Sequence, residues 1–521
     1  MIIIEKKDKI FLGILFIVSL LIRAGVYQWY LSNNQRYWQV DSNTYHLVAQ
    51  EIAKDNGISQ ANGQPNFYRL PGYPVFIAFF YKLFGPQPTT FLWIQVVLAS
   101  CIPLLIFLLV LGLFPRRRWL AYCASLYSSI HLGLVLYSGF FMSETLFIFF
   151  FLLFSLMFLP NVHWWFCRSV DIERWQDACR CQPDMFTFLP DETTESPAFT
   201  AFYEKIQEAK HAELCQTPAV DVSYKYFLLA GIFLGLASMV RPVGHYVLVV
   251  ALFLLLFSYD GWKKKLTRAA VLVGSWLIVV LPWLLRNYLL LGHLFFHTLP
   301  GGHFLYFSAA RVVASVDQCS YAQAKDKVGH EVNQRMQDEE RIKHRELTEI
   351  ERCYVHEHLA RHYFVQHPLV TMKLWLTDIF RTCFSLYSAE LLYLEADRPE
   401  FDYFSSKRGI WSLFARYLFP QTNNWYLKLI VYLEILLFLF MLTGCLLSFV
   451  FLLGGMLRGA ALWNDVCSML SMLSFIALFL VIALAGGYAR MRLPIEPFII
   501  IIGWYGWLSV ASLCTKGVNR G

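Results

Sequence analysis

The stretch VDSNTYHLVAQEIAKDNG, residues 40–57, follows directly on the first long apolar run of the chain. Tyr45, Val48, Ala49 and Ile52 recur at the spacing of one apolar helix face. Asp41 or Ser42 stands where such a helix would have its N-cap. This arrangement predicts a short helix next to a membrane span, and it raises the question of whether Asp41 caps that helix or performs chemistry.

The composition is that of a membrane protein. Hydrophobic residues make up 57% of the chain and charged residues 16%, against about 25% charged residues in soluble proteins. Several apolar runs reach the roughly 20 residues that a helix needs to cross a bilayer. The first run follows EKKDK and lacks a small-residue cleavage site, which favours a retained span over a signal peptide. We therefore expect an all-α integral membrane protein.

About ten transmembrane helices are predicted. Lysines near the N-terminus, Arg116–Arg118 and Lys263–Lys265 all fall on one side when these spans alternate, as the positive-inside rule requires. Both termini are then expected inside the cell. The predicted spans are residues 10–31, 90–114, 119–137, 144–160, 226–240, 243–259, 269–290, 426–453, 466–486 and 494–513.

Two segments decide this topology. Residues 226–259 form either one long helix or a hairpin broken at Arg241-Pro242, and proline disfavours a helical residue before it, so we favour the hairpin. Residues 368–387 are amphipathic and contain Lys373, Asp378 and Arg381, which indicates a surface helix rather than a span. A single helix at the first segment, or a span at the second, would reverse the later helices.

These assignments divide the chain into three parts. Residues 1–293 form a membrane core that includes the first outer loop, 32–89, and an inner loop, 161–223. Residues 294–424 form an extracytoplasmic helical segment, and residues 425–521 contribute the C-terminal transmembrane helices.

Unusual polar residues gather on the predicted outer side. Ionisable residues at membrane depth are costly and often mark function. Arginine binds phosphate through a planar fork of donors, and a carboxylate can accept a proton from an attacking hydroxyl. The combination suits group transfer from a lipid-linked phosphate. The outer-side residues are Asp41, Glu144, Arg241, His245, Arg286, Asn287, Arg490 and Arg492.

Six short motifs occur in an order that resembles the GT-C superfamily of membrane glycosyltransferases. The nearest branch contains the protein O-mannosyltransferases, the lipid A aminoarabinose transferases and RgtA/B/C/D-like domains. The departures are Ser42 where many relatives have a second acidic residue, and the lack of an obvious lectin-like domain. The motifs are D-x-x-x-Y-x-x-x-A (Asp41, Tyr45, Ala49), R-x-P-G-Y-P (69–74), Y-S-G-x-x-x-x-E-T (137–145), Arg241-Pro242, P-W-x-x-R-N (282–287) and R-x-R-L-P-I-E-P (490–497).

The resemblance implies a GT-C-type helix bundle and an inverting hexosyl- or pentosyltransferase. The donor would be a polyprenyl-phosphate sugar and the acceptor a glycan, lipid or protein. The site would face the periplasm, or an equivalent lumen, from a bacterial inner membrane. The implied residues are Asp41 and Glu144 for catalysis, Arg241, Arg286, Arg490 and Arg492 for the donor phosphate, and Tyr45, Arg69, Tyr73, His245 and Asn287 for the substrate loop.

Metal binding stays open at this point. Some relatives use a divalent metal, to which Asp41, Glu144 and His245 could contribute ligands. The inner loop contains Cys-x-Cys and His-x-x-x-Cys, but their spacing fits no common zinc module, and free thiols in a reducing compartment explain them more simply. The inner-loop residues concerned are Cys167, Cys179, Cys181, His211 and Cys215.

Structural interpretations compete with the functional ones. Asp41 and Glu144 could each cap a helix, where the dipole favours negative charge, and the arginines could be interfacial anchors. Arg23, inside the first span, could face the same pocket. The rival function is a transporter or flippase of lipid-linked sugars. We see no internal repeat of the kind that transporters carry, and the ionisable groups lie on one side. A scaffold protein would leave the arginines unexplained.

Overall fold

The computed structural model describes residues 4–32, 36–181, 224–258, 261–396, 418–420, 422–458, 463–482 and 487–518. Within these ranges the chain is built from helices, so the all-α prediction is confirmed. The first part of the chain contains α1 (Lys6–Ser32), α2 (Ser42–Ala53), α3 (Gly72–Phe84), α4 (Pro88–Ser100), α5 (Ile102–Leu113), α6 (Arg118–Ile130), α7 (Leu132–Gly139), α8 (Glu144–Cys181), α10 (Tyr224–Val240), α11 (Val243–Leu256) and α12 (Trp262–Leu291). The second part contains α13 (Leu299–His303), η1 (Phe304–Ala309), α14 (Ala310–Val316), α15 (Tyr321–Lys343), α16 (Glu349–Gln366), α17 (Pro368–Phe384), α18 (Ser388–Ala396), α20 (Trp425–Arg458), α21 (Trp463–Ile482), α22 (Ala489–Arg492), η3 (Leu493–Ile495) and α23 (Glu496–Val518).

All ten predicted spans coincide with helices, but they do not all have the length of a span. Seven described helical stretches are long and apolar enough to cross a membrane, and α6 with α7, bent by 48°, makes an eighth if the pair is one span. The helices α10 and α11 are apolar but too short to qualify. The reason lies in the sequence, because Pro242 interrupts the apolar run between them.

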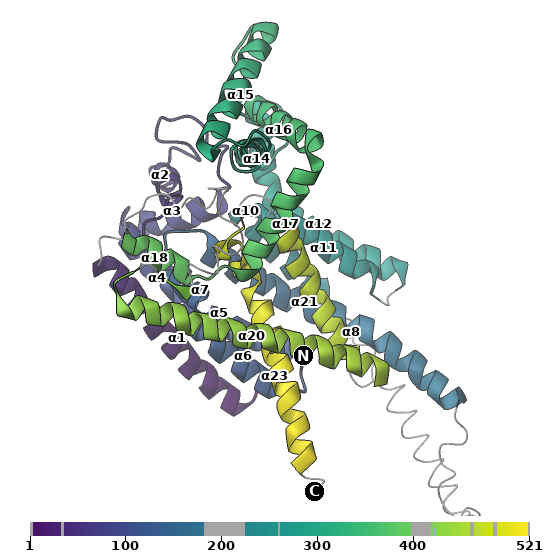
Figure 1. The fold of residues 1–521 in the computed structure, drawn as a ribbon. Helices are drawn as coiled ribbons and strands as arrows, with labels where there is room; N and C mark the ends of the chain where they lie inside the picture. The colour runs from purple at the N-terminus through teal and green to yellow at the C-terminus, as the bar shows by residue number, and fades with distance from the viewer. Residues whose placement is uncertain are drawn as a thin grey trace, which may run out of the picture.

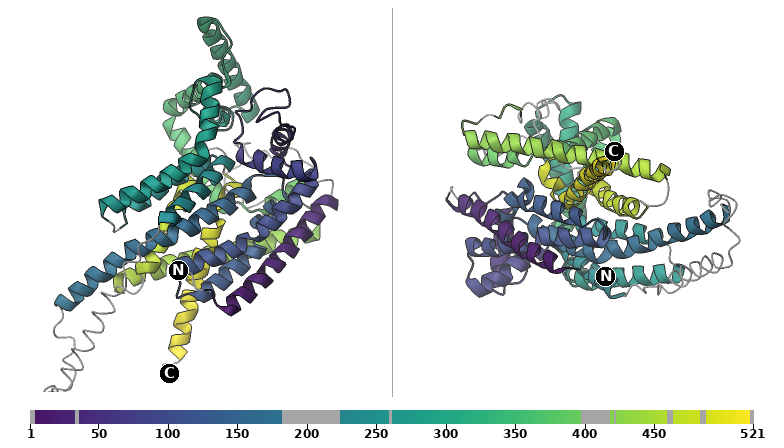
Figure 2. Two further views of the ribbon diagram at one scale, coloured as in Figure 1. Left: turned by 180° about the vertical axis from the view of Figure 1, so that it is seen from behind. Right: turned by 90° about the horizontal axis from the view of Figure 1, so that it is seen from below.

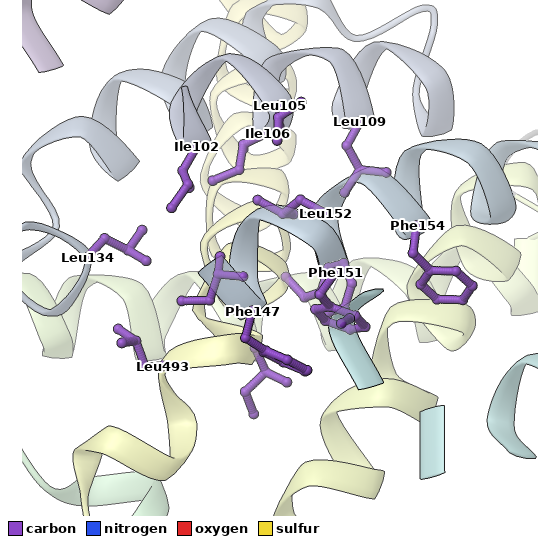
Figure 3. Packing of buried hydrophobic residues seen from close by; sticks show 14 of the residues in the cluster. Ile102, Leu105, Ile106, Leu109, Leu134, Phe147, Phe151, Leu152, Phe154 and Leu493 are labelled. Atoms are coloured by element: carbon purple, nitrogen blue, oxygen red, sulfur yellow. The ribbon is translucent and has the colours of Figure 1, made fainter. Parts of the chain in front are cut away.

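The core of the bundle lies between α5, α7, α8 and η3. Figure 3 shows Ile102, Ile106, Leu134, Phe151 and Leu493 from these elements pointing toward one another, and all five are fully or almost fully buried. The peripheral helices differ sharply: 67% of the most apolar window of α4–α5 is buried, against 22% for both α1 and α20. The apolar outward faces of α1 and α20 are therefore the ones available to lipid.

The segment around Arg241 turns back on itself, which confirms the hairpin. A Cβ atom on Gly244 would lie 2.6 Å from the Cα atom of Ser238, an approach that a continuous helix cannot make over six residues. Gly72, from the R-x-P-G-Y-P turn, also packs closely against the end of α10. A Cβ atom on Gly72 would lie 2.6 Å from the carbonyl carbon of Met239. Two close glycine contacts thus fix the end of α10 and, with it, the start of the Arg241-Pro242 break.

Helices α14, α15 and α16 lie together at one end of the molecule, away from both chain termini (Figures 1 and 2). The predicted side of the membrane for each terminus and for residues 294–424 stays a prediction. Helix α17 is not among the candidate spans, as predicted. Its Asp378 is buried, and Arg311 of α14 compensates the charge by donating to both carboxylate oxygens, at 2.7 and 2.9 Å.

Replacing Gly72 with alanine tests the close approach of α3 to α10. We expect Gly72→Ala to destabilise the protein by about 1–3 kcal/mol, because the new methyl group meets backbone rather than a movable side chain. Thermal unfolding in detergent measures the effect. Gly25→Ala in α1 is the matched control, since nothing lies within 4 Å of its Cβ position. Equal melting temperatures for the two variants would contradict the packing described.

Candidate active site

Asp41 does not cap the helix that it precedes. It occupies the N-cap position of α2, but its side chain makes no capping hydrogen bond. The carboxylate instead accepts hydrogen bonds from Arg69 at 2.6 Å and from Arg490 at 2.9 Å. Arg490 is separated from Asp41 by 449 residues. The capping interpretation of Asp41 is therefore wrong, and its carboxylate joins the first outer loop to the start of the last membrane segment.

Glu144 occupies the matching position at the start of α8. Its Oε1 atom accepts from Arg490 and lies 2.5 Å from Nη1 of Arg241. Its side chain is completely buried, whereas the side chain of Asp41 is 24% exposed. The carboxylate open to an approaching hydroxyl is consequently that of Asp41, while Glu144 lies beneath it.

The five residues form one ion-pair network, which we call the outer network: Asp41, Arg69, Glu144, Arg241 and Arg490. Three guanidinium groups face two carboxylates in these ion pairs, so the five side chains together carry one net positive charge. A buried charge without a counter-ion is costly. The network is therefore suited to receive one further anionic group.

Local structure explains how each arginine reaches the outer network. Arg69 precedes the Pro71-Gly72 turn, and its guanidinium also lies over the ring of Tyr45, 4.9 Å from the centroid. Arg241 stands at the break between α10 and α11. Arg490 lies in α22, a single turn that enters α23 through η3. All three arginines are thus held where regular helix is interrupted.

The ion pairs control the protonation of Asp41. Burial alone would raise the pKa of this carboxyl, but the guanidinium groups of Arg490 and Arg69 outweigh it and hold the pKa well below its usual value. Asp41 is thus ionised at neutral pH and, while both arginines are bound to it, a weak base.

The other two predicted phosphate-binding arginines lie elsewhere. Arg286 donates to the carbonyl oxygens of Ile58 at 2.8 Å and Asn66 at 3.3 Å, and so fastens the first outer loop to α12. Arg492 is buried, bound to Glu496 at 2.5 Å and to the carbonyl oxygens of Thr382 and Cys383 at 2.8 and 2.6 Å. Neither of them contacts Asp41 or Glu144 in the described hydrogen bonds and ion pairs. Their contacts give no support to the expectation that they bind phosphate.

Some of the predicted substrate-loop residues contact the outer network, and others only hold neighbouring helices and loops together. Tyr45 supports Arg69 from below and bonds to Ser143 at 3.2 Å. Tyr73 is buried and donates to Gln95 at 2.8 Å, and Asn287 donates to the carbonyl oxygen of Phe295 at 2.9 Å. These last two hold the surrounding helices and loops together. Arg23 lies apart from the outer network, bound to Ser19 and to the carbonyl oxygens of Ser128 and Ser129.

Several buried polar atoms beside the outer network have no hydrogen-bond partner within the described part of the chain. They are Oε2 of Glu144, both ring nitrogens of His245 and Nδ1 of His297. The ring of His245 stacks on Phe296 at 3.6 Å between centroids. Burial and the nearby charge of Arg69 lower the pKa of His297 to about 4, which keeps this histidine neutral at pH 7. Unsatisfied buried polar atoms are rare in native proteins, so these atoms are candidates for ligand contacts.

Sequence reasoning missed two residues near the outer network, Glu390 and His297. Glu390 in α18 accepts from Tyr137 at 2.9 Å. Burial raises the pKa of Glu390, although Tyr137 and Arg490 act in the opposite direction. Both residues occur in stretches with no recognisable motif, A-E-L-L-Y and F-H-T-L-P. His297 lies in the connection between α12 and α13, and Glu390 lies in α18 after the chain has passed through α13–α17, so only the folded chain brings both near the outer network.

Metal ligands do not gather around the carboxylates. No group of three His, Cys, Asp or Glu side chains suited to a metal exists among the residues that the structure describes. Asp41 and Glu144 have arginine partners instead of each other. The side chains of the inner-loop residues suggested for zinc, namely Cys167, Cys179, Cys181, His211 and Cys215, lie outside the described residues.

No protein-family model and no curated protein matches the chain. Archaeal oligosaccharyltransferase AglB from Archaeoglobus fulgidus, in complex with an inhibitory peptide and a dolichol-phosphate, is similar over 99% of this chain and 52% of its own, at 12% identity and a TM-score of 0.46. The Archaeoglobus fulgidus oligosaccharyltransferase tethered to an acceptor peptide with the NVT sequon is similar over 97% and 49%, at 14% identity and a TM-score of 0.43.

The chain thus spans about half the length of both oligosaccharyltransferases. These two proteins have the GT-C fold, the superfamily that the sequence motifs resemble.

Removing one member of the outer network should be costly. We expect Glu144→Gln to destabilise the protein by about 3–5 kcal/mol, because Arg241 loses the carboxylate that it is paired with and Arg490 keeps only Asp41. Thermal or denaturant unfolding in detergent measures this. Asp55→Asn is the matched control, since the side chain of Asp55 is 81% exposed and its pairing with Lys82 is screened by water. A Glu144→Gln protein as stable as Asp55→Asn would show that the network contributes nothing.

The lowered pKa of Asp41 predicts the pH range over which its ion pairs stabilise the folded protein. A carboxyl whose pKa falls on folding stabilises the protein above its unfolded pKa, about 3.9, and this contribution is lost as the pH falls through the folded pKa. The difference in unfolding free energy between the natural protein and Asp41→Asn should be constant from pH 7 to about pH 5 and shrink below about pH 4. A difference that shrinks between pH 7 and pH 5 would contradict the assigned ion pairs.

Proposed function

We propose that this protein is a GT-C-type membrane glycosyltransferase that uses a polyprenyl-phosphate sugar as donor. The observation that carries the proposal is the outer network, in which one positive charge is left over beside a partly exposed carboxylate. A phosphate supplies the missing negative charge, and arginine forks bind its oxygens well. The carboxylate supplies a proton acceptor for the incoming hydroxyl.

An apolar cavity supports a lipid-linked donor over a soluble one. The cavity has a volume of about 350 Å³ and is lined mainly by aliphatic and aromatic side chains of α17, α20, α21 and α23, among them Leu437 and Ile499. Arg492 and Tyr387 form part of its polar end. The ring of Tyr387 lies 6.3 Å from that of Tyr137, whose hydroxyl binds Glu390. Tyr387, Tyr137 and Glu390 thus connect this cavity to the surroundings of Arg490, whose charge acts on Glu390.

The proposed reaction is a single displacement at the anomeric carbon. The acceptor hydroxyl oxygen forms a bond to this carbon, while the bond from the carbon to the phosphate oxygen breaks. The polyprenyl phosphate leaves with the electron pair, and Asp41 takes the hydroxyl proton. Attack from the face opposite the leaving group inverts the anomeric configuration. Arginine side chains that are already in place stabilise the charge that develops on the phosphate.

The arginines also explain how a weak base becomes a stronger one. In the described structure Arg490 and Arg69 lower the pKa of Asp41. A donor phosphate would compete with Asp41 for Arg490, and a weaker ion pair raises the carboxyl pKa toward the range useful in proton transfer. Glu144 contacts Arg241 and Arg490 from below and acts as a positioning residue rather than as a second base.

Substitution of Asp41 separates a transferase from a flippase. We expect Asp41→Asn to reduce sugar transfer by at least about 100-fold, since the proton acceptor is lost, while binding of undecaprenyl phosphate by the purified protein persists. Mass spectrometry of polyprenyl-linked sugars and surface glycans, in cells lacking the gene and complemented with each variant, measures transfer. The same polyprenyl-phosphate sugar should accumulate with Asp41→Asn as without the gene.

Asp55→Asn is the control for this experiment, because it removes a carboxylate from the same outer loop without touching the outer network. It should restore normal glycans. Full complementation by Asp41→Asn would refute the proposed base and would favour lipid transport, in which Asp41 has no proton to accept.

A further inference from the structure

A second cavity adjoins the outer network on its outer side. It has a volume of about 620 Å³ and lies between the first outer loop and α16, within the usual size range of small-molecule sites. Arg69 is part of its wall and donates to Asp41 at 2.6 Å. A group at the base of this cavity is therefore one side chain away from the proposed proton acceptor.

The wall of this cavity is rich in groups that bind hydroxyls. The amide side chains of Gln60, Asn62 and Asn66 and the hydroxyls of Thr44 and Thr298 line it, and the half-exposed ring of Tyr68 offers an aromatic surface. Amides both donate and accept hydrogen bonds. This mixture is suited to a ligand with many hydroxyl groups and apolar C–H faces, which is the chemistry of sugars.

The charges on the wall balance one another. Glu349 and Arg352 have opposite signs, and Arg69 is paired with Asp41, a carboxylate that it shares with Arg490. Glu349 is held at the cavity by a single long hydrogen bond from Gln60, at 3.4 Å, and burial raises its pKa. A carboxyl partly removed from water in this way gains by accepting hydrogen bonds from ligand hydroxyls. The wall offers no surplus charge for a phosphorylated or carboxylated ligand.

We propose that this cavity binds the acceptor and that the acceptor is an uncharged oligosaccharide. The inference rests on the proposed function, because it places the acceptor hydroxyl beside Asp41. The two substrates then enter from different surroundings: the donor phosphate meets an excess of guanidinium groups, and the acceptor meets a wall without net charge. A peptide acceptor would use the same opening but would not need the amide-rich wall.

Binding of the full-length protein in nanodiscs to defined ligands tests this proposal. The probes are arrays of neutral oligosaccharides, of carboxylated and phosphorylated oligosaccharides, and of peptides. We expect neutral oligosaccharides to be retained, and the double variant Asn62→Ala, Glu349→Gln to bind them at least about tenfold more weakly. Gln60→Ala should also weaken the binding of neutral oligosaccharides. This second variant keeps the proposal testable if the double variant does not fold.

The matched control is Asp338→Asn on α15, a carboxylate of the same extracytoplasmic segment that does not line the cavity. It should bind oligosaccharides like the natural protein, and all variants should keep their melting temperature and their affinity for undecaprenyl phosphate. The proposal is wrong if no oligosaccharide binds, if charged oligosaccharides or peptides bind in their place, or if the cavity variants bind as well as Asp338→Asn. If undecaprenyl phosphate does not bind the natural protein, the proposed donor is wrong. The oligosaccharide binding data can still be interpreted in that case.

Discussion

Arg490, near the C-terminal end of the chain, joins two carboxylates from the N-terminal third, Asp41 and Glu144, and the outer network is organised around this bridge. Its Nη2 atom lies 2.9 Å from Asp41, and its Nε atom donates to Glu144. Taking these charges out of water is costly unless each has a partner. The start of α2, the start of α8 and the turn before α23 are therefore constrained to meet at one place.

The same constraint shapes the chemistry. A carboxylate bound by two guanidinium groups is ionised but accepts a proton poorly. The site is thus prepared for an anion before it is prepared for proton transfer, and the anion itself would release the carboxylate. In the proposed function, this order would couple donor binding to activation of the acceptor hydroxyl.

Arginines of similar sequence context have different roles because of what surrounds them. Arg241 and Arg490 share the carboxylate of Glu144. Arg286 instead donates to loop carbonyl oxygens. Arg492 donates to Glu496 and to two carbonyl oxygens. The latter two give the first outer loop and the α17–α22 junction their shape. Two cavities of opposite character differ in the same way: an apolar cavity is lined in part by Arg492, and a polar cavity is lined in part by Arg69.

The sequence by itself determined the helices, the hairpin at Arg241-Pro242 and the non-spanning character of α17, because apolar periodicity and proline act over a few residues. It also placed Asp41, Glu144, Arg241 and Arg490 on one side. It could not decide whether Asp41 caps α2, which arginines reach the carboxylates, or that Glu390 and His297 lie near them. Only the tertiary structure decided these points, because an ion pair between residues 449 positions apart depends on how the helices pack and leaves no local pattern in the sequence.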